Sequence, residues 1–113
     1  MLLALDKYSA LHIFTSAEDA EGNLEAIDVQ QDGFEFCDTQ GRRYAVIYTR
    51  SPRERRIGPL GFVDVGRFKL VAEGSIDPAL PNLFVERAAH IEQSSLSAIK
   101  TVDALRDELR KRA

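Results

Sequence analysis

The sequence of 113 residues contains a single cysteine, Cys37. One thiol excludes an internal disulfide and any zinc site built from several cysteines, so a reducing cytoplasm is the expected location. No segment approaches the ~20 apolar residues needed to cross a bilayer. The apolar opening at residues 1–5 lacks a basic leader and is interrupted by Asp6 and Lys7. We therefore expect neither a secretory signal nor a membrane partner, and we expect residues 1–5 to pack on the core as a strand or helix.

The motifs of common catalytic sites are also missing. The chain has no glycine-rich phosphate loop, no G-x-S-x-G elbow and no H-E-x-x-H sequence. Nucleophilic catalysis would need Cys37 together with His12 or His90, but a cysteine inside a strand usually packs as a small apolar side chain. We therefore assign no catalytic residue, no metal ligand and no cofactor. A small enzyme stays the third hypothesis, and it would require His12 or His90 hydrogen-bonded to a carboxylate inside a cleft.

A predicted β-hairpin at residues 34–49 is the clearest feature that is present. Aromatic and β-branched residues fill 34–37 and 42–49, and the run 38–41 between them is typical of a turn. Asp38 suits the first position of a type I turn, and Gly41 accepts the positive φ that rejoins the second strand. We expect the rest of the chain to pack onto this hairpin.

Periodicity and capping residues predict the other elements. Ser16, followed three residues later by Asp19, predicts a helix that begins at Ala17 and ends near Ala26. The further expectations are a strand at 10–15 with His12 on its surface, a strand at 27–30, an exposed loop at 50–61, strands at 62–65 and 67–72, a turn at 73–75 and a helix at 101–112. Residues 83–92 favour a helix, with a strand over the first half of this run as the alternative. The predicted fold is a single α+β domain with an antiparallel sheet centred on the hairpin, a short N-terminal helix and an amphipathic C-terminal helix.

Charge is distributed unevenly along the chain, although its net value is only −3. Residues 1–38 carry nine acidic groups and one lysine, whereas residues 39–58 carry six arginines and one glutamate. An acidic patch would speed the capture of a basic protein. The leading hypothesis is therefore a cytoplasmic protein-binding module, immunity-like or regulatory, whose patch consists of Glu18, Glu21, Glu25 and Asp28. A purely solubilising surface is the alternative.

The arginines support a second hypothesis. Guanidinium groups pair with phosphate or carboxylate, so the run that contains Arg50, Arg53, Arg55 and Arg56 would bind nucleic acid or an acidic protein. The protein's own acidic helix could instead neutralise these arginines. Tyr44 and Tyr48 would supply stacking rings for nucleic acid, unless they belong to the core.

Three segments resemble small uncharacterised bacterial proteins: residues 16–21, residues 24–29 and the turn 37–42. The resemblance covers about residues 10–48, and some proteins of this kind resemble immunity factors for contact-delivered toxins. It implies a cytoplasmic binding role and transfers no catalytic residue. The chain is expected to be a monomer or a homodimer. Val102, Leu105 and Leu109 form an apolar stripe that would support dimerisation, although packing within the chain is favoured.

Overall fold

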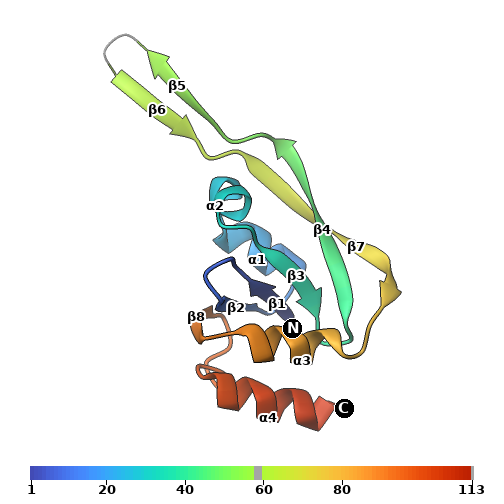
Figure 1. The fold of residues 1–113 in the computed structure, drawn as a ribbon. Coiled ribbons are helices and arrows are strands. Elements are labelled where there is room, and N and C mark those ends of the chain that lie inside the picture. The colour runs from blue at the N-terminus through green and yellow to red at the C-terminus, as the bar shows by residue number, and fades with distance from the viewer. Residues whose placement is uncertain (58–59, 113) are drawn as a thin grey trace.

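The structure is a computed structural model that describes residues 1–57 and 60–112, with the side chains of residues 1–52 and 65–112. A six-stranded sheet carries helices on both faces, and a two-stranded hairpin, here called the arm, projects away from it (Figure 1). The strands are β1 (Leu2–Leu5), β2 (Ala10–Phe14), β3 (Glu35–Asp38), β4 (Arg42–Arg50), β5 (Arg53–Ile57), β6 (Leu60–Asp64), β7 (Arg67–Ile76) and β8 (His90–Ser94). The helices are α1 (Ala17–Asn23), α2 (Ala26–Gln31), α3 (Leu80–Arg87) and α4 (Val102–Arg112). The fold is α+β, as the sequence predicts.

The sheet has the strand order β7-β4-β3-β1-β2-β8. The predicted hairpin is confirmed, because β3 and β4 pair antiparallel and Gly41 ends the turn with a φ of 95°. The amide of Gly41 donates to the Asp38 carbonyl at 3.2 Å. β2 and β8 pair in parallel, so the sheet is mixed rather than antiparallel throughout. A parallel pair needs a long crossover connection, which local sequence patterns do not reveal.

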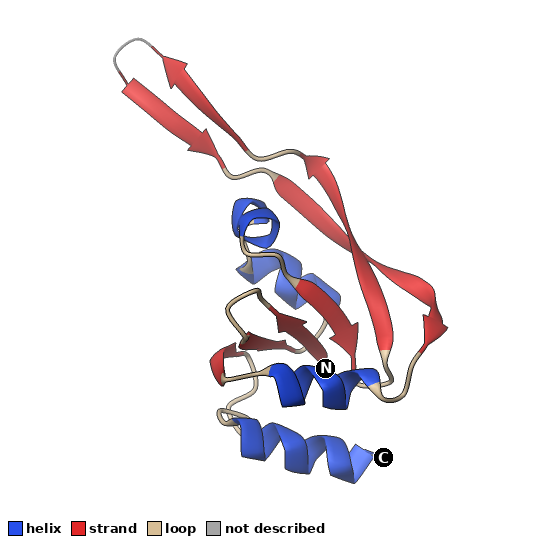
Figure 2. Cartoon of the chain, in the orientation of Figure 1, coloured by secondary structure: helices blue, strands red, loops and turns tan. Residues whose placement is uncertain are grey.

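β1 lies inside the sheet and buries all four of its side chains. Leu2 and Ala4 belong to the core under α1 and α2, whereas Leu3 and Leu5 belong to the core under α3 and α4. The two pairs of helices lie on opposite sides of the sheet (Figure 2). Both faces of the strand are covered, and this explains why its sequence is apolar at every position instead of alternating. The opening residues therefore pack on the core as a strand.

The two short helices follow one another along the acidic part of the chain. The predicted start of α1 at Ala17 is confirmed, and the Ser16 hydroxyl accepts a hydrogen bond from the Asp19 amide at 3.1 Å. The predicted strand at residues 27–30 is wrong, because α2 occupies this segment. Ala26 and Val29 are the buried positions, and their spacing of three residues is helical. Residues 27–30 are too few to distinguish the period of a helix from the period of a strand.

The predicted loop at residues 50–61 is also wrong. β5 and β6 pair antiparallel within this region, with Arg53 opposite Asp64 and Ile57 opposite Leu60. Pro52 precedes β5, where its missing N–H removes no hydrogen bond from the ladder. β7 then continues to Ile76 along β4, so the turn predicted at residues 73–75 is not formed.

The C-terminal part covers the second face of the sheet. The helix predicted at residues 83–92 begins earlier, at Leu80, and ends at Arg87, because the following residues pair with β2 as β8. α4 is confirmed, and the Thr101 hydroxyl accepts a hydrogen bond from the Ala104 amide at 3.1 Å. Leu105 and Leu109 are buried in the core with α3, so the apolar stripe packs within the chain.

Candidate functional site

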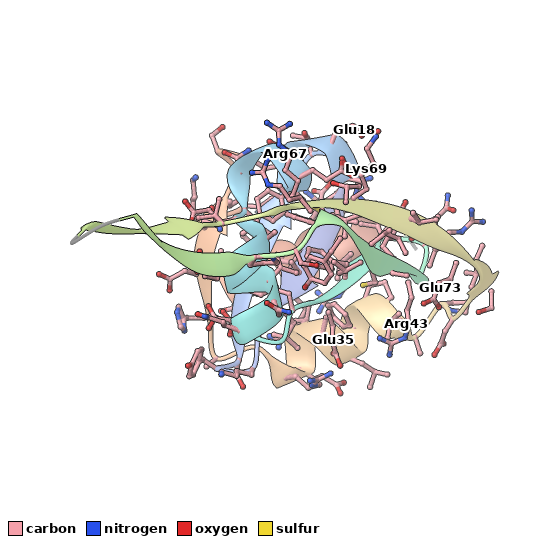
Figure 3. All side chains as sticks on the ribbon, turned by 90° about the horizontal axis from the view of Figure 1, so that it is seen from above. Glu18, Glu35, Arg43, Arg67, Lys69 and Glu73 are labelled. Atoms are coloured by element: carbon pink, nitrogen blue, oxygen red, sulfur yellow. The ribbon has the colours of Figure 1, made fainter. Side chains whose placement is uncertain are left out.

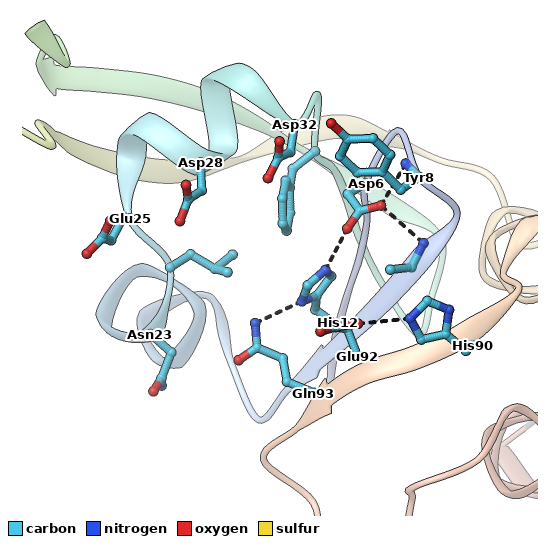
Figure 4. Close-up of a pocket in the computed structure, with 13 residues that line it drawn as sticks. Asp6, Tyr8, His12, Asn23, Glu25, Asp28, Asp32, His90, Glu92 and Gln93 are labelled. Carbon is cyan, nitrogen blue, oxygen red and sulfur yellow. Dashed lines mark hydrogen bonds and ion pairs between the residues drawn. The ribbon is translucent and has the colours of Figure 1, made fainter.

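A hollow of about 660 Å³ lies between α2, the turn that joins β1 to β2, and β8 (Figure 4). Five carboxylates line it, while no lysine or arginine of the described residues does: Asp6, Glu25, Asp28, Asp32 and Glu92. Two histidines and two aromatic rings also contribute to the wall: His12, His90, Tyr8 and Phe34. We call this site the acidic hollow.

Three of the carboxylates come from α2 and its two ends. Glu25, Asp28 and Asp32 are spaced by three and four residues, so the helix places them on one face. Glu25 is the N-cap residue, but its side chain makes no capping hydrogen bond. None of the three carboxylates has a hydrogen bond or ion pair with another described side chain or backbone group. They are therefore available to a bound cation.

Asp6, His12 and Gln93 form a hydrogen-bonded chain at the base of the hollow. Nε2 of His12 lies 3.0 Å from Oδ2 of Asp6, and its Nδ1 lies 2.8 Å from Nε2 of Gln93. The Oδ1 of Asp6 accepts hydrogen bonds from the amides of Tyr8 at 2.8 Å and Ala10 at 3.1 Å. The chain therefore ties the turn after β1 to β2 and β8. His12 is only 5% exposed, so its expected position on the strand surface is wrong.

These hydrogen bonds decide the charge of Asp6. Burial raises the pKa of this carboxyl. The hydrogen bonds from His12 and from the amides of Ala10 and Tyr8 lower the pKa by more than burial raises it, so the pKa lies below its ordinary value. An ionised Asp6 only accepts, so Nε2 of His12 carries the proton and Nδ1 accepts from the Gln93 amide. Asp6 thus adds a negative charge to the base of the hollow at neutral pH.

The geometry required by the enzyme hypothesis is present, but its chemistry is incomplete. His12 is bound to a carboxylate inside a cleft, and His90 lies 2.8 Å from Glu92 at the rim. Both ring nitrogens of His12 are occupied, so neither is free to take a proton from a substrate. Cys37 lies in the core under α3 and α4, where burial raises the pKa of its thiol to about 12. A thiol in this state is a poor nucleophile.

The structure divides the predicted acidic patch. Glu25 and Asp28 line the acidic hollow, whereas Glu18 lines a separate hollow beside Tyr44. Glu21 has a structural role, since its Oε2 accepts a hydrogen bond from the Leu70 amide at 3.1 Å.

Three carboxylates of the hollow are not in the predicted patch. Asp32 follows Glu25 and Asp28 at helical spacing, so a prediction of α2 would also have predicted Asp32 as a site residue. Asp6 and Glu92 join the site only because the sheet brings β1 and β8 beside β2, and no local signal marks them.

The structure leaves the arginine hypothesis untested. Arg50 ends β4 at the base of the arm, and the side chains of Arg53, Arg55 and Arg56 lie outside the described residues. Tyr44 and Tyr48 pack against the core under α1 and α2, where burial raises the pKa of both phenols. These two rings are therefore core residues rather than an exposed stacking surface.

No group of three or more His, Cys, Asp or Glu side chains within residues 1–52 and 65–112 is arranged to hold a metal ion. None of the helices in the described ranges is long and apolar enough to cross a membrane. No protein-family model, no curated protein and no solved structure matches this chain. The resemblance to immunity-type proteins stays a prediction.

Proposed function

We propose that this protein is a binding module that captures a basic segment of a partner protein in the acidic hollow. The supporting observation is the convergence of five carboxylates around a space that no described lysine or arginine lines. Three of them come from α2 and its ends, one from the turn after β1 and one from β8. The space of about 660 Å³ falls within the range of 300–1,000 Å³ that is typical of ligand pockets. An immunity-like or regulatory role would follow from capture of a basic toxin or enzyme.

The rim of the hollow suits a cationic side chain. Tyr8 is 66% exposed and stands beside the carboxylates, and the Lys7 ammonium lies 5.2 Å from the centroid of its ring. The Phe34 ring lies 4.8 Å from His12, centroid to centroid. Aromatic faces attract guanidinium and ammonium groups, and carboxylates on one helix face can accept the parallel N–H bonds of arginine. Complementary charge also accelerates encounter, and rim charges act mainly on the association rate.

Affinity purification from the native host, followed by titration of the purified partner, tests this proposal. The variant Glu25→Gln with Asp28→Asn removes two charges from the hollow and preserves side-chain size. We expect it to bind the partner at least tenfold more weakly, with a smaller salt dependence. The matched control is Glu86→Gln with Asp107→Asn, which removes two exposed carboxylates from α3 and α4. Equal partner affinity for both double variants and the natural sequence would exclude the acidic hollow as the binding site.

The projecting arm supports a second candidate function, nucleic-acid binding through Arg50, Arg53, Arg55 and Arg56. A two-stranded antiparallel ribbon has dimensions that fit the major groove of DNA, and β5 and β6 form such a ribbon away from the sheet (Figure 1). Titration of labelled DNA and RNA at two salt concentrations is the test, since phosphate contacts weaken steeply as salt rises. Absence of binding at low salt would remove this candidate.

A further inference from the structure

Within the described residues, no helix covers one face of the β4–β7 pair. Tyr44, Val46 and Phe68 point into the core under α1 and α2, so the intervening residues point to the opposite side of the sheet. The core under α3 and α4 takes its strand residues from β1, β2 and β3, with no described residue of β4 or β7. We call the uncovered side of β4 and β7 the open face.

Apolar side chains are exposed on this face. Ile47 is 50% exposed and Val71 is 51% exposed, and Ala45 lies opposite Val71 in the ladder. The described residues have five exposed large apolar side chains, and two of them, Ile47 and Val71, lie on the open face. Such a concentration on one pair of strands is typical of a contact surface rather than of scattered exposure.

Charges on β7 are arranged symmetrically about Val71. Lys69, Val71 and Glu73 alternate along the strand, so the two opposite charges lie about 7 Å on either side of Val71. Neither charged side chain has a hydrogen bond or ion pair with another described residue. Figure 3 shows Lys69 on the part of β7 nearer the arm, and Glu73 with Arg43 toward the other end.

We propose that a second copy of this chain packs its open face against this one, with a twofold axis close to Val71. A twofold contact requires each charge to meet its opposite at an equal distance from the axis. With antiparallel β7 strands, Lys69 meets Glu73 of the partner subunit, and the same pair forms a second time across the axis. On β4, Arg43 and Ile47 flank Ala45, so the Arg43 stem covers Ile47 of the partner subunit without a like-charge contact.

Packing of faces agrees better with the structure than addition of a strand to the β7 edge. The outward amide of Leu70 is already bound to Glu21 of α1, which lies against β7. The ladder between β4 and β7 is also irregular between Arg42 and Tyr44. A helix and an irregular ladder are both devices that protect an edge strand from pairing. A contact between open faces leaves both features intact.

The size of the open face predicts weak association. Seven residues of each strand span about 20 Å, and two adjacent strands are about 10 Å wide. This area is smaller than the ~800 Å² that each partner buries in a standard stable complex. We therefore expect a reversible dimer that forms at high micromolar concentration and dissociates on dilution.

Sedimentation equilibrium at roughly 10 µM to 1 mM tests the proposal, because this range covers the dissociation constant expected for such a small interface. The variants reverse the charges of the proposed pairs. Lys69→Glu alone and Glu73→Lys alone each place like charges at both symmetric contacts, and each should weaken dimerisation about tenfold or more. A mixture of the two single variants restores both pairs across the interface and should dimerise like the natural protein. The double variant Lys69→Glu with Glu73→Lys should do the same.

Lys111→Glu at the end of α4 is the control, and it should leave the dimer unchanged. A natural protein that stays monomeric at 1 mM would overturn the proposal and assign the open face to another partner. Dimerisation that is insensitive to both single reversals, or that is not restored in the mixture, would also overturn it. Circular dichroism of each variant establishes that the fold is retained.

Discussion

Replacement of Gly41 by alanine should be among the most destabilising single-methyl additions in this protein. Gly41 is buried with a φ of 95°, a conformation that costs an L side chain about 1–2 kcal/mol. A Cβ at this position would overlap the carbonyl group of Asp77, which is backbone and cannot rotate away. The hydrogen bond from the Asp77 amide to the Gly41 carbonyl, 3.0 Å long, would be lost with the displacement, at a cost of about 1 kcal/mol.

These contributions predict a loss of about 3 kcal/mol or more in the free energy of unfolding. For a chain of this size, the loss corresponds to a fall of roughly 10–20 °C in melting temperature. Urea unfolding and calorimetry measure both quantities. Gly22→Ala is the matched control, because nothing lies within 4 Å of its added methyl group and the site is helical. It should stabilise the protein by about 0.5–1 kcal/mol. A Gly41→Ala variant within about 0.5 kcal/mol of the natural protein would refute this reasoning.

Two further predictions concern buried ionisable groups. The pKa of Asp6 is lowered in the folded state, so its ionised form stabilises the fold above the unfolded pKa of about 4, and this contribution is lost as the pH falls through the folded pKa. Asp6→Ala should therefore cost about 2–4 kcal/mol at pH 7 and show a smaller loss of stability below pH 4, measured by urea unfolding across pH; an unchanged pH dependence would contradict this. The Cys37 thiol, with a pKa of about 12, should react with a disulfide reagent roughly a thousandfold more slowly in the native protein than in urea, and equal rates would show that it is accessible.

Elements whose signals are local could be predicted from sequence. The hairpin of β3 and β4 depends on a turn whose residues are adjacent, and α4 combines a capping hydroxyl at Thr101 with an apolar stripe that extends over about two turns. The start of α1 at Ala17 follows from the same kind of contact, made by the capping hydroxyl of Ser16. In each case the residues that form the element also supply its hydrogen bonds.

Short segments with ambiguous periods could not be predicted. The sequence of α2 does not distinguish a helix from a strand, because the helix spans only six residues. Arginine, proline and glycine predict a loop at residues 50–61, where the structure forms the arm. The arm is extended because β5 pairs with β6. The sequence of either segment alone does not reveal this pairing. The irregular extension of β7 along β4 has the same origin.

By itself, the sequence determined which residues are charged, which turns can form and which helix faces are apolar. It thereby placed Glu25 and Asp28 among the candidate binding residues. Only the tertiary structure decided that Asp6 and Glu92 join them and that Glu21 does not. The reason is physical: a carboxylate belongs to a site through its distance to other charges, and the pairing of β1, β2 and β8 fixes that distance between residues far apart in the chain.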